Sequence, residues 1–403
     1  MGKFLLPSQC LCVMSDGLLD CIVVGLGGHG SATLFHLASR GLNVLGLEQF
    51  HPAHVQGSSH GNSRIFRQAY FEHPKYVPLL RRSFTLWNEL SKTADDPEKL
   101  FHICGALMIG LPSSSVIKGT LLSIQEHNMP HQILSSDEVR ARYPMMHLDE
   151  DEIGIFEAEA GYLNPELCID LHLKAAKNLG ADIHYEEEMT SYSLNSDDSV
   201  TVTTSRGRYD ARKLILTVGA WAHAVYGKDI CIPLHLERRV LYWFKPVAHI
   251  DEFKRIPVYI WDLGHGDNFY GFPEQPGFHA GGVKVAFHQQ EAASDRPVHP
   301  DQVSRQVQAA EDSPLRAVLR RKMPALDGEL LSCVSCLYTL TPDEHFLIDF
   351  HPRSQAVILA SPCSGHGFKF CAVVGEILAD LAHQGSTAHD ISLFRLARPA
   401  LLE

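Results

Sequence analysis

No stretch of this 403-residue sequence approaches the roughly 20 consecutive apolar residues that a transmembrane helix needs. The first residues are also a poor match to a signal peptide, because Lys3 is their only positive charge and Pro7 interrupts their apolar stretch. We therefore expect a cytoplasmic protein with no membrane partner. Residues 1–14, which end at Met14, are either a loose leader or lie upstream of the true start.

Basic residues are fewer than acidic residues in this sequence. Lys and Arg number 35 against 47 Asp and Glu, which gives a net charge of −12. Nucleic acid and anionic surfaces are therefore not expected as partners. An anionic substrate would need a local cluster of cations.

Cysteine is too sparse for a disulfide framework, since ten residues are spread over 403 positions. Cys333 and Cys336 have C-x-x-C spacing, but no second cysteine or histidine pair stands at zinc spacing. We expect reduced thiols and no metal site. The 45% hydrophobic content is enough for a globular chain of two or three units.

The strongest positive feature is a glycine turn between two apolar runs, in residues 20–48. A β-branched run leads into Gly25, Gly27 and Gly30, a helical apolar pattern follows, and the second run ends at Glu48. This order is typical of a dinucleotide-binding unit, whose helix N-terminus receives the phosphates. Glu48 would accept ribose hydroxyls and repel a 2′-phosphate, so NADP is disfavoured, whereas FAD and NAD both remain open at this point.

A second glycine turn lies near the C-terminus. Residues 356–361 predict a strand, Gly365 and Gly367 follow it, and residues 372–381 predict a helix. Backbone N–H groups at such a turn can meet a ring or a phosphate. The nucleotide-binding domain is therefore predicted to be built from both ends of the chain.

Three basic residues are candidates for an anion site. Arg64 and Arg67 are three apart in a polar loop, so they would face one way on a helix or tight turn. Solvated surface charges and an anion site both fit this spacing. Lys284 alternates with apolar neighbours on a predicted strand. It is either an edge residue or a cation directed at the inner face of a sheet.

Taken together, five motifs resemble the monomeric sarcosine oxidase group of flavin amine oxidases, which includes N-methyltryptophan oxidase and pipecolate oxidase. The resemblance covers nearly the whole chain. The motifs are Gly25-x-Gly27-x-x-Gly30, Gly57-Ser-Ser-His60-Gly-x-Ser63-Arg64-x-x-Arg67-x-Ala-Tyr, Tyr270-Gly-Phe-Pro, Cys336-Leu-Tyr-Thr-x-Thr-Pro-Asp-Glu-His-Phe and Ser364-Gly-His-Gly-Phe-Lys369-Phe.

The resemblance implies FAD held covalently through Cys336, not Cys333, at the flavin 8α-methyl. It implies that Arg67 and Lys369 bind the substrate carboxylate, for which a planar guanidinium is suited. Lys284 would serve oxygen reduction. The other implied catalytic or pocket positions are His60, Arg64, Tyr270 (also a substrate contact) and His288. The implied cofactor contacts are Gly25, Gly27, Gly30, Glu48, Ser63, Arg64, Cys336, Gly365, Gly367 and Lys369.

The resemblance and the element pattern together predict an α/β fold, with a Rossmann-type FAD-binding domain and a strand-rich substrate domain formed by insertions. The predicted FAD-binding domain comprises residues 1–100, 160–230 and 330–403, and the substrate domain comprises residues 101–159 and 231–329. Within the second domain, apolar spacing predicts helices at residues 121–128 and 303–311.

The function implied is oxidation of an N-methyl or cyclic secondary α-amino acid to an imine by a monomer, with O2 reduced to hydrogen peroxide. Alternatives are a dehydrogenase with a non-oxygen acceptor, an oxidase of another amine such as pipecolate or N-methyltryptophan, and a flavoprotein whose FAD is structural or sensory. The sequence departs from the family at Ser361-Pro-Cys363, and His29 and His54 match no family role.

Overall fold

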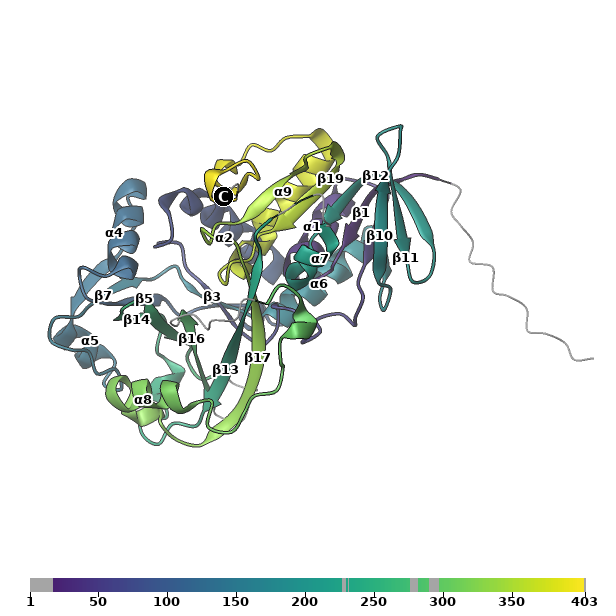
Figure 1. Ribbon diagram of the computed structural model, residues 1–403. Helices are drawn as coiled ribbons and strands as arrows, with labels where there is room; N and C mark the ends of the chain where they lie inside the picture. Colours follow the sequence, from purple (N-terminus) through teal and green to yellow (C-terminus); the bar gives the residue numbers. More distant parts are fainter. Residues whose placement is uncertain (1–16, 227–229, 231, 276–281, 290–296, 402–403) are drawn as a thin grey trace, which may run out of the picture.

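The computed structural model describes residues 17–226, 230, 232–275, 282–289 and 297–401 (Figure 1). Residues 1–16, which include the predicted leader, lie outside the described residues. The helices are α1 (Gly28–Ser39), α2 (Val77–Ser91), α3 (Pro97–Leu100), α4 (Ser115–His127), α5 (Ser136–Arg142), α6 (Pro165–Asn178), α7 (Ala222–Tyr226), α8 (Ser313–Lys322) and α9 (Cys371–Gln384). Among the described residues, no helix is long and apolar enough to span a membrane.

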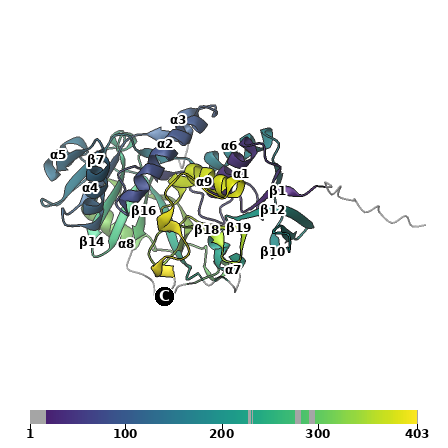
Figure 2. The same ribbon diagram turned by 90° about the horizontal axis from the view of Figure 1, so that it is seen from above.

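The first sheet is built around parallel strands from both ends of the chain. Its path runs β10 (Met189–Leu194), β11 (Val200–Thr204), β12 (Arg208–Leu216), β1 (Leu19–Val24), β2 (Val44–Leu47) and β9 (Asp182–His184). Off this path, β19 (Ser354–Ser361) pairs with β12 in parallel, and β18 (Leu347–His351) pairs with β19. Helix α1 packs between α6 and α9, as Figure 2 shows from above. The predicted α/β class is confirmed.

The second sheet mixes strands from three regions of the chain, residues 106–157, 235–289 and 330–340. Its order is β17 (Leu330–Leu340), β13 (His235–Phe244), β16 (Val283–Gln289), β15 (Asp267–Gly271), β14 (Val258–Gly264), β5 (Ala106–Gly110), β7 (Ile153–Glu157) and β6 (Gln132–Ser135). A small third sheet has the order β3 (Arg64–Phe66), β8 (Gly161–Leu163) and β4 (Phe101–Ile103). Residues 330–340, which the sequence analysis placed with the FAD-binding segments, form the edge strand β17 of the second sheet.

Two helix predictions need correction. The predicted helix at residues 303–311 is wrong, because no regular element spans it and the helix begins instead at Ser313, with Pro314 in its first turn. Val303 and Val307 have helical spacing, but they pack against different apolar clusters. The helix expected to start at residue 121 starts at Ser115, where Ser114 accepts the Ile117 N–H.

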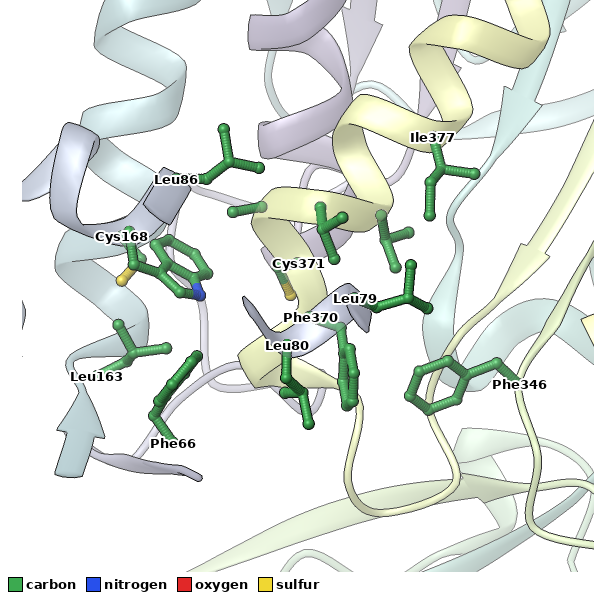
Figure 3. Close-up of a cluster of buried hydrophobic side chains, with 14 of the residues drawn as sticks. Phe66, Leu79, Leu80, Leu86, Leu163, Cys168, Phe346, Phe370, Cys371 and Ile377 are labelled. Atoms are coloured by element: carbon green, nitrogen blue, oxygen red, sulfur yellow. The ribbon is translucent and has the colours of Figure 1, made fainter. Parts of the chain in front are cut away.

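A large apolar core lies between α2 and α9 and holds the C-terminal glycine turn in place. Figure 3 shows Leu79 and Leu80 of α2 facing Phe370 and Cys371 at the start of α9, with Phe346 beside Phe370. Burying each side chain of this size stabilises the fold by about 1.5–3 kcal/mol. The core therefore fixes the residues immediately before α9, which belong to the site described next.

Candidate cofactor and substrate site

In the glycine turn after β1, the three glycines differ in what a side chain at each position would meet. Gly25 has φ +86°, which disfavours other residues, and a Cβ on Gly30 would lie 1.8 Å from the Gly25 carbonyl oxygen. A Cβ on Gly27 would meet open space, since its nearest atom is Ser59 Oγ at 3.8 Å. Gly25 and Gly30 are thus needed to pack α1 on the sheet, whereas Gly27 leaves the backbone open to a ligand.

Glu48, directly after β2, has a buried and oriented carboxylate. Its Oε2 accepts the Leu26 N–H at 2.8 Å, and its Oε1 accepts the Phe50 N–H at 3.0 Å. His54 lies close, with Nε2 3.5 Å from Glu48 Oε1, and its Nδ1 accepts the Gln56 N–H. A fixed carboxylate beside a glycine turn is the arrangement that accepts the ribose hydroxyls of an adenosine.

One continuous cavity runs from this turn to the second sheet. Its lining includes most of the predicted site residues, together with His29 and His54, to which the sequence assigned no role. The predicted residues that line it are Gly25, Gly27, Glu48, Arg64, Arg67, Tyr270, His288, Cys336, Gly365, Gly367 and Lys369. Gly30, His60, Ser63 and Lys284 are absent from the lining.

Cys336 on β17 is a buried thiol beside a buried guanidinium. Arg64 Nη2 lies 3.6 Å from Cys336 Sγ, and the same nitrogen donates to the Ser58 carbonyl at 2.7 Å. Cys333, three residues earlier on β17, does not line the cavity. Every cysteine in the part of the chain that the structure describes is a free thiol. The geometry therefore brings Cys336, and not Cys333, to the cavity.

Lys284 lies behind the cavity wall, and it is an inward-directed residue of β16, not an edge residue. It is 1% exposed, and its Nζ donates to the carbonyls of Gly61 and Ser63 and to Ser63 Oγ. These three acceptors match the three N–H donors of an ammonium. Burial, with the nearby Arg64 charge, nevertheless lowers the pKa of Lys284 well below its usual range.

His60 is buried near the same cations. Burial, reinforced by the charges of Arg64 and Lys284, lowers the pKa of His60 to about 3. The imidazole is therefore neutral at physiological pH. It adds no charge to the cluster.

Arg67 faces the cavity with part of its guanidinium already paired. Its Nη2 donates to both oxygens of Glu72, at 2.6 and 2.7 Å, and its Nη1 donates to the Ala69 carbonyl. Although burial opposes ionisation of Glu72, the Arg67 charge lowers the pKa of that carboxyl to about 2. The buried Nε of Arg67 has no partner among the described residues. It can therefore donate to an incoming anion.

Lys369 lies in the C-terminal glycine turn and lines the same cavity as Arg67. Its Nζ donates to the His366 carbonyl at 2.7 Å and lies 3.4 Å from the hydroxyl of Tyr70, whose ring also stacks on Arg67. Its carbonyl accepts from Ser83 and Trp87 on α2, which fixes the turn. Burial and the Arg67 charge lower the pKa of Lys369 to about 7.

Three ring side chains from the second sheet complete the cavity wall. His288 Nδ1 and the Tyr338 hydroxyl are 3.1 Å apart, and the Tyr270 ring packs edge-on against His288. Burial lowers the pKa of His288 to about 3 and raises that of Tyr270 to about 12, so neither is charged near neutral pH.

Some residues of the site were not singled out from the sequence. Glu72 and Tyr338 line the cavity and contact predicted site residues. Both lie within or next to the recognised motifs, and this position is the one feature of the sequence that could have singled them out. Pairing of Glu72 with Arg67 depends on the tertiary path of the loop, which the sequence does not reveal.

The residues present fit FAD. The cavity joins the open side of Gly27, the oriented carboxylate of Glu48 and the thiol of Cys336. An open glycine turn and an oriented carboxylate are suited to a pyrophosphate and a ribose. The adjacent cations Arg67 and Lys369 leave room in the same cavity for an anionic substrate.

Comparisons with known proteins show the family and the fold. The family model described as FAD dependent oxidoreductase matches residues 20–381. The chain is 42% identical over 378 residues to monomeric sarcosine oxidase of Streptomyces avermitilis, covering 93% of this chain and 96% of that protein. It is 33% identical over 384 residues to N-methyl-L-tryptophan oxidase of Salmonella dublin, covering 94% and 98%.

Among solved structures, NikD, an unusual amino acid oxidase essential for nikkomycin biosynthesis, has a TM-score of 0.79 at 24% identity, covering 94% of this chain and 97% of that one. L-proline dehydrogenase from P. horikoshii has a TM-score of 0.78 at 20% identity, covering 94% and 96%. These two share the fold. The resemblance predicted from the motifs is confirmed by the sequence relatives.

Proposed function

Because this chain belongs to the FAD-dependent oxidoreductase family, we propose that it oxidises an N-methyl or cyclic secondary α-amino acid to an imine, with O2 reduced to hydrogen peroxide. The observation that carries this proposal is the pair Arg67 and Lys369, which lines the same cavity as Cys336. The unpaired Nε of Arg67 is the natural donor to a substrate carboxylate. Glu72 already pairs with Arg67, and Lys369 adds a second basic group that can bind an anion in the cavity.

The side chains divide the work between binding and electrostatics. Arg67 and Lys369 anchor the carboxylate, and this orients the amine carbon. Tyr270 and the neutral His288 form the wall beside it without adding charge. Three oxygen acceptors hold the Lys284 Nζ behind the wall near Arg64, where its protonated form would stabilise the negative charge that develops when O2 is reduced.

FAD supplies the redox chemistry when bound, by taking a hydride equivalent from the carbon next to the amine nitrogen and passing the electrons on. We propose that Gly27, Glu48, Gly365 and Gly367 hold it and that Cys336 carries the covalent bond. The first sheet would then form the FAD-binding domain and the second sheet the substrate domain. A monomer is proposed, because the related sarcosine oxidases are named as monomeric.

Covalent attachment has a direct test. Acid-precipitated protein should stay yellow, and its mass should exceed that of the chain by one FAD. Cys336→Ser should lose all colour on precipitation, whereas the matched control Cys333→Ser should keep it. Colour retained by the Cys336 variant would refute the assignment.

The reaction is tested with purified holoprotein. Mixed anaerobically with sarcosine, L-proline, L-pipecolate or N-methyltryptophan, the flavin absorbance should bleach with at least one of them, and air should then produce peroxide. Bleaching by none of these amines would contradict the proposal. Bleaching followed by electron transfer to a quinone, without peroxide in air, would identify a dehydrogenase instead.

A further inference from the structure

Glu157 is a buried carboxylate next to the cavity but outside its lining. It is the last residue of β7 and is only 6% exposed. Its Oε1 accepts the Gln68 N–H at 2.9 Å, and its Oε2 accepts the Ala69 N–H at 3.0 Å. One carboxylate thus binds two consecutive backbone amides. Those amides belong to the two residues that directly follow Arg67.

Keeping a carboxylate at this depth is costly. Burial raises the pKa of Glu157 to about 7, even though the amides of Ala69 and Gln68 and the Arg67 charge all act to lower it. A buried group that is hard to ionise, yet is aimed at two specific N–H groups, points to a requirement for those groups to stay in place.

The same short segment holds the guanidinium. Arg67 Nη1 donates to the Ala69 carbonyl at 3.3 Å, and its Cζ lies 4.2 Å from the centroid of the Tyr70 ring. The Gln68 side chain donates to the Glu159 carbonyl, which ties the segment to the turn after β7. Ala69 is therefore fixed through its N–H by Glu157, and its carbonyl in turn fixes Arg67.

Glu72 and Glu157 relate to Arg67 in different ways. Glu72 pairs directly with Nη2 of the guanidinium, whereas the bonds of Glu157 go to the backbone that carries it. Removing Glu72 would change what the guanidinium is paired with. Removing Glu157 would change where the guanidinium is.

We propose that Glu157 is a positioning residue for the substrate carboxylate: by clamping the Gln68 and Ala69 amides, it holds the Arg67 guanidinium in register with Lys369. The inference rests on the proposed function, because it assumes that this pair of cations binds the carboxylate. Glu157 does not line the cavity, so it acts through Arg67 and has no contact of its own with the substrate.

The test uses Glu157→Gln holoenzyme at about pH 8, where the wild-type carboxyl is mostly ionised. A glutamine offers one acceptor oxygen and turns an N–H₂ donor towards the second amide. We expect KM for the amino acid, and the Kd of the competitor acetate read from the flavin spectrum, to rise about tenfold or more. Turnover at saturating substrate should stay within about twofold, since the chemistry is untouched. Weak binding of uncharged acetamide should not change.

Glu159→Gln is the matched control. Glu159 lies two residues after Glu157 and its side chain is exposed, so the substitution removes the same charge from the surface. It should behave as wild type. Glu157→Asp keeps the charge but shortens the side chain by one methylene. Its KM and its Kd for acetate should lie between those of wild type and Glu157→Gln. Unchanged acetate affinity in folded Glu157→Gln, or a fall in turnover with unchanged KM, would overturn the proposal. Loss of folding in both Glu157 variants, with a normal Glu159 variant, would overturn it too, by making Glu157 a residue of general stability.

Arg67→Ala, measured in parallel, separates this inference from the function beneath it. If acetate affinity falls in Arg67→Ala but not in Glu157→Gln, only the positioning role fails. If acetate binds Arg67→Ala as tightly as wild type, the carboxylate site itself lies elsewhere, and both proposals fall.

Discussion

Two buried lysines serve this cavity, and they are held in different ways. Lys284 donates to three oxygen acceptors and lies 4.7 Å from the Phe272 ring centroid, so its ammonium is enclosed in a fixed cage. Lys369 has one close carbonyl partner and an adjacent Arg67, and burial lowers the pKa of both lysines, that of Lys369 to about 7. The fixed position of Lys284 behind the wall suits its proposed role towards O2, and the place of Lys369 in the lining suits binding of an anion.

Lys284→Met tests the first role. Removal of the caged charge should slow the reaction of the reduced enzyme with O2 by orders of magnitude, while reduction by the amine changes much less. Stopped-flow traces of the two half-reactions, recorded separately, decide it. If O2 still reoxidises the flavin quickly while the amine reduces it much more slowly, Lys284 belongs to the substrate site instead.

Lys322→Met is the matched control for Lys284. Lys322 is equally buried, but it pairs with Asp149 and Glu152 instead of lying behind the cavity wall near Arg64. Its loss should lower stability, since two carboxylates lose their partner. It should leave both half-reactions unchanged.

The depressed pKa of Lys369 predicts a pH dependence. Only the protonated amine attracts a carboxylate, so acetate affinity should be full below about pH 7 and should weaken above it by up to about tenfold per pH unit. The fall should level off where Arg67 alone remains. In Lys369→Met the affinity should be low throughout and free of this step. A spectral titration with acetate between about pH 6 and 9 measures it, and a flat wild-type profile would contradict the assignment.

At the scale of elements, the site depends on how tightly α1 seats on the first sheet. Its N-terminal glycine turn approaches the Thr217 side chain and the Gly25 carbonyl, and its body packs against α9 and α6. This packing involves Gly25 and Gly30, whereas Gly27 in the same turn meets open space. The packing and the open side of Gly27 can therefore be disturbed separately.

Gly30→Ala and Gly27→Ala should give contrasting results. A methyl at Gly30 would clash with the Gly25 carbonyl at 1.8 Å, so α1 must shift and the apparent Tm should fall markedly. A methyl at Gly27 meets no protein atom within 3.8 Å, so the fold should persist with reduced flavin content. Thermal unfolding and flavin absorbance per chain separate the two effects. Unchanged flavin content in folded Gly27→Ala would show that the open side of Gly27 is not a ligand surface.

The elements also show what the sequence could and could not predict. The glycine turn, α6 with Pro165 in its first turn and the strand and helix around the second glycine turn depend on local signals, and the structure has them. The predicted helix at residues 303–311 failed because Val303 and Val307 satisfy a helical period while packing in different clusters. Cys336 was identified by its motif. The pairings of Arg67 with Glu72 and of Glu157 with the following amides are long-range or loop-dependent, and no local pattern encodes them.

At the scale of the whole molecule, the cavity is shared between two sheets. Glu48 and the glycine turn extend from the first sheet, whereas Tyr270, His288 and Cys336 lie on strands of the second. A cofactor that spans the cavity would therefore couple the two sheets in unfolding.

Such coupling predicts that Tm responds to added FAD only when the flavin is not covalently bound. In Cys336→Ser the bound FAD can dissociate, so Tm should rise with added FAD, by mass action equivalent to about 2.7 kcal/mol at 100 times Kd. Wild-type Tm should not respond to added FAD. Differential scanning calorimetry at several FAD concentrations measures this, with Cys333→Ser as the matched control. A Cys336 variant whose Tm ignores FAD would mean that the cavity does not bind it reversibly.

The pairing of β1 with β12, and the packing of α1 on α9, also govern when this protein can mature on the ribosome. The first strand emerges early together with its parallel neighbour β2, but its other neighbour, β12, belongs to the middle of the chain and α9, which packs on α1, to its end. At about 5–20 residues per second, one edge of β1 therefore stays unpaired for tens of seconds. The cavity stays incomplete until the residues before α9 have left the exit tunnel. Under the proposed function we therefore expect FAD to load after translation, so that a nascent chain stalled before α9 does not retain flavin.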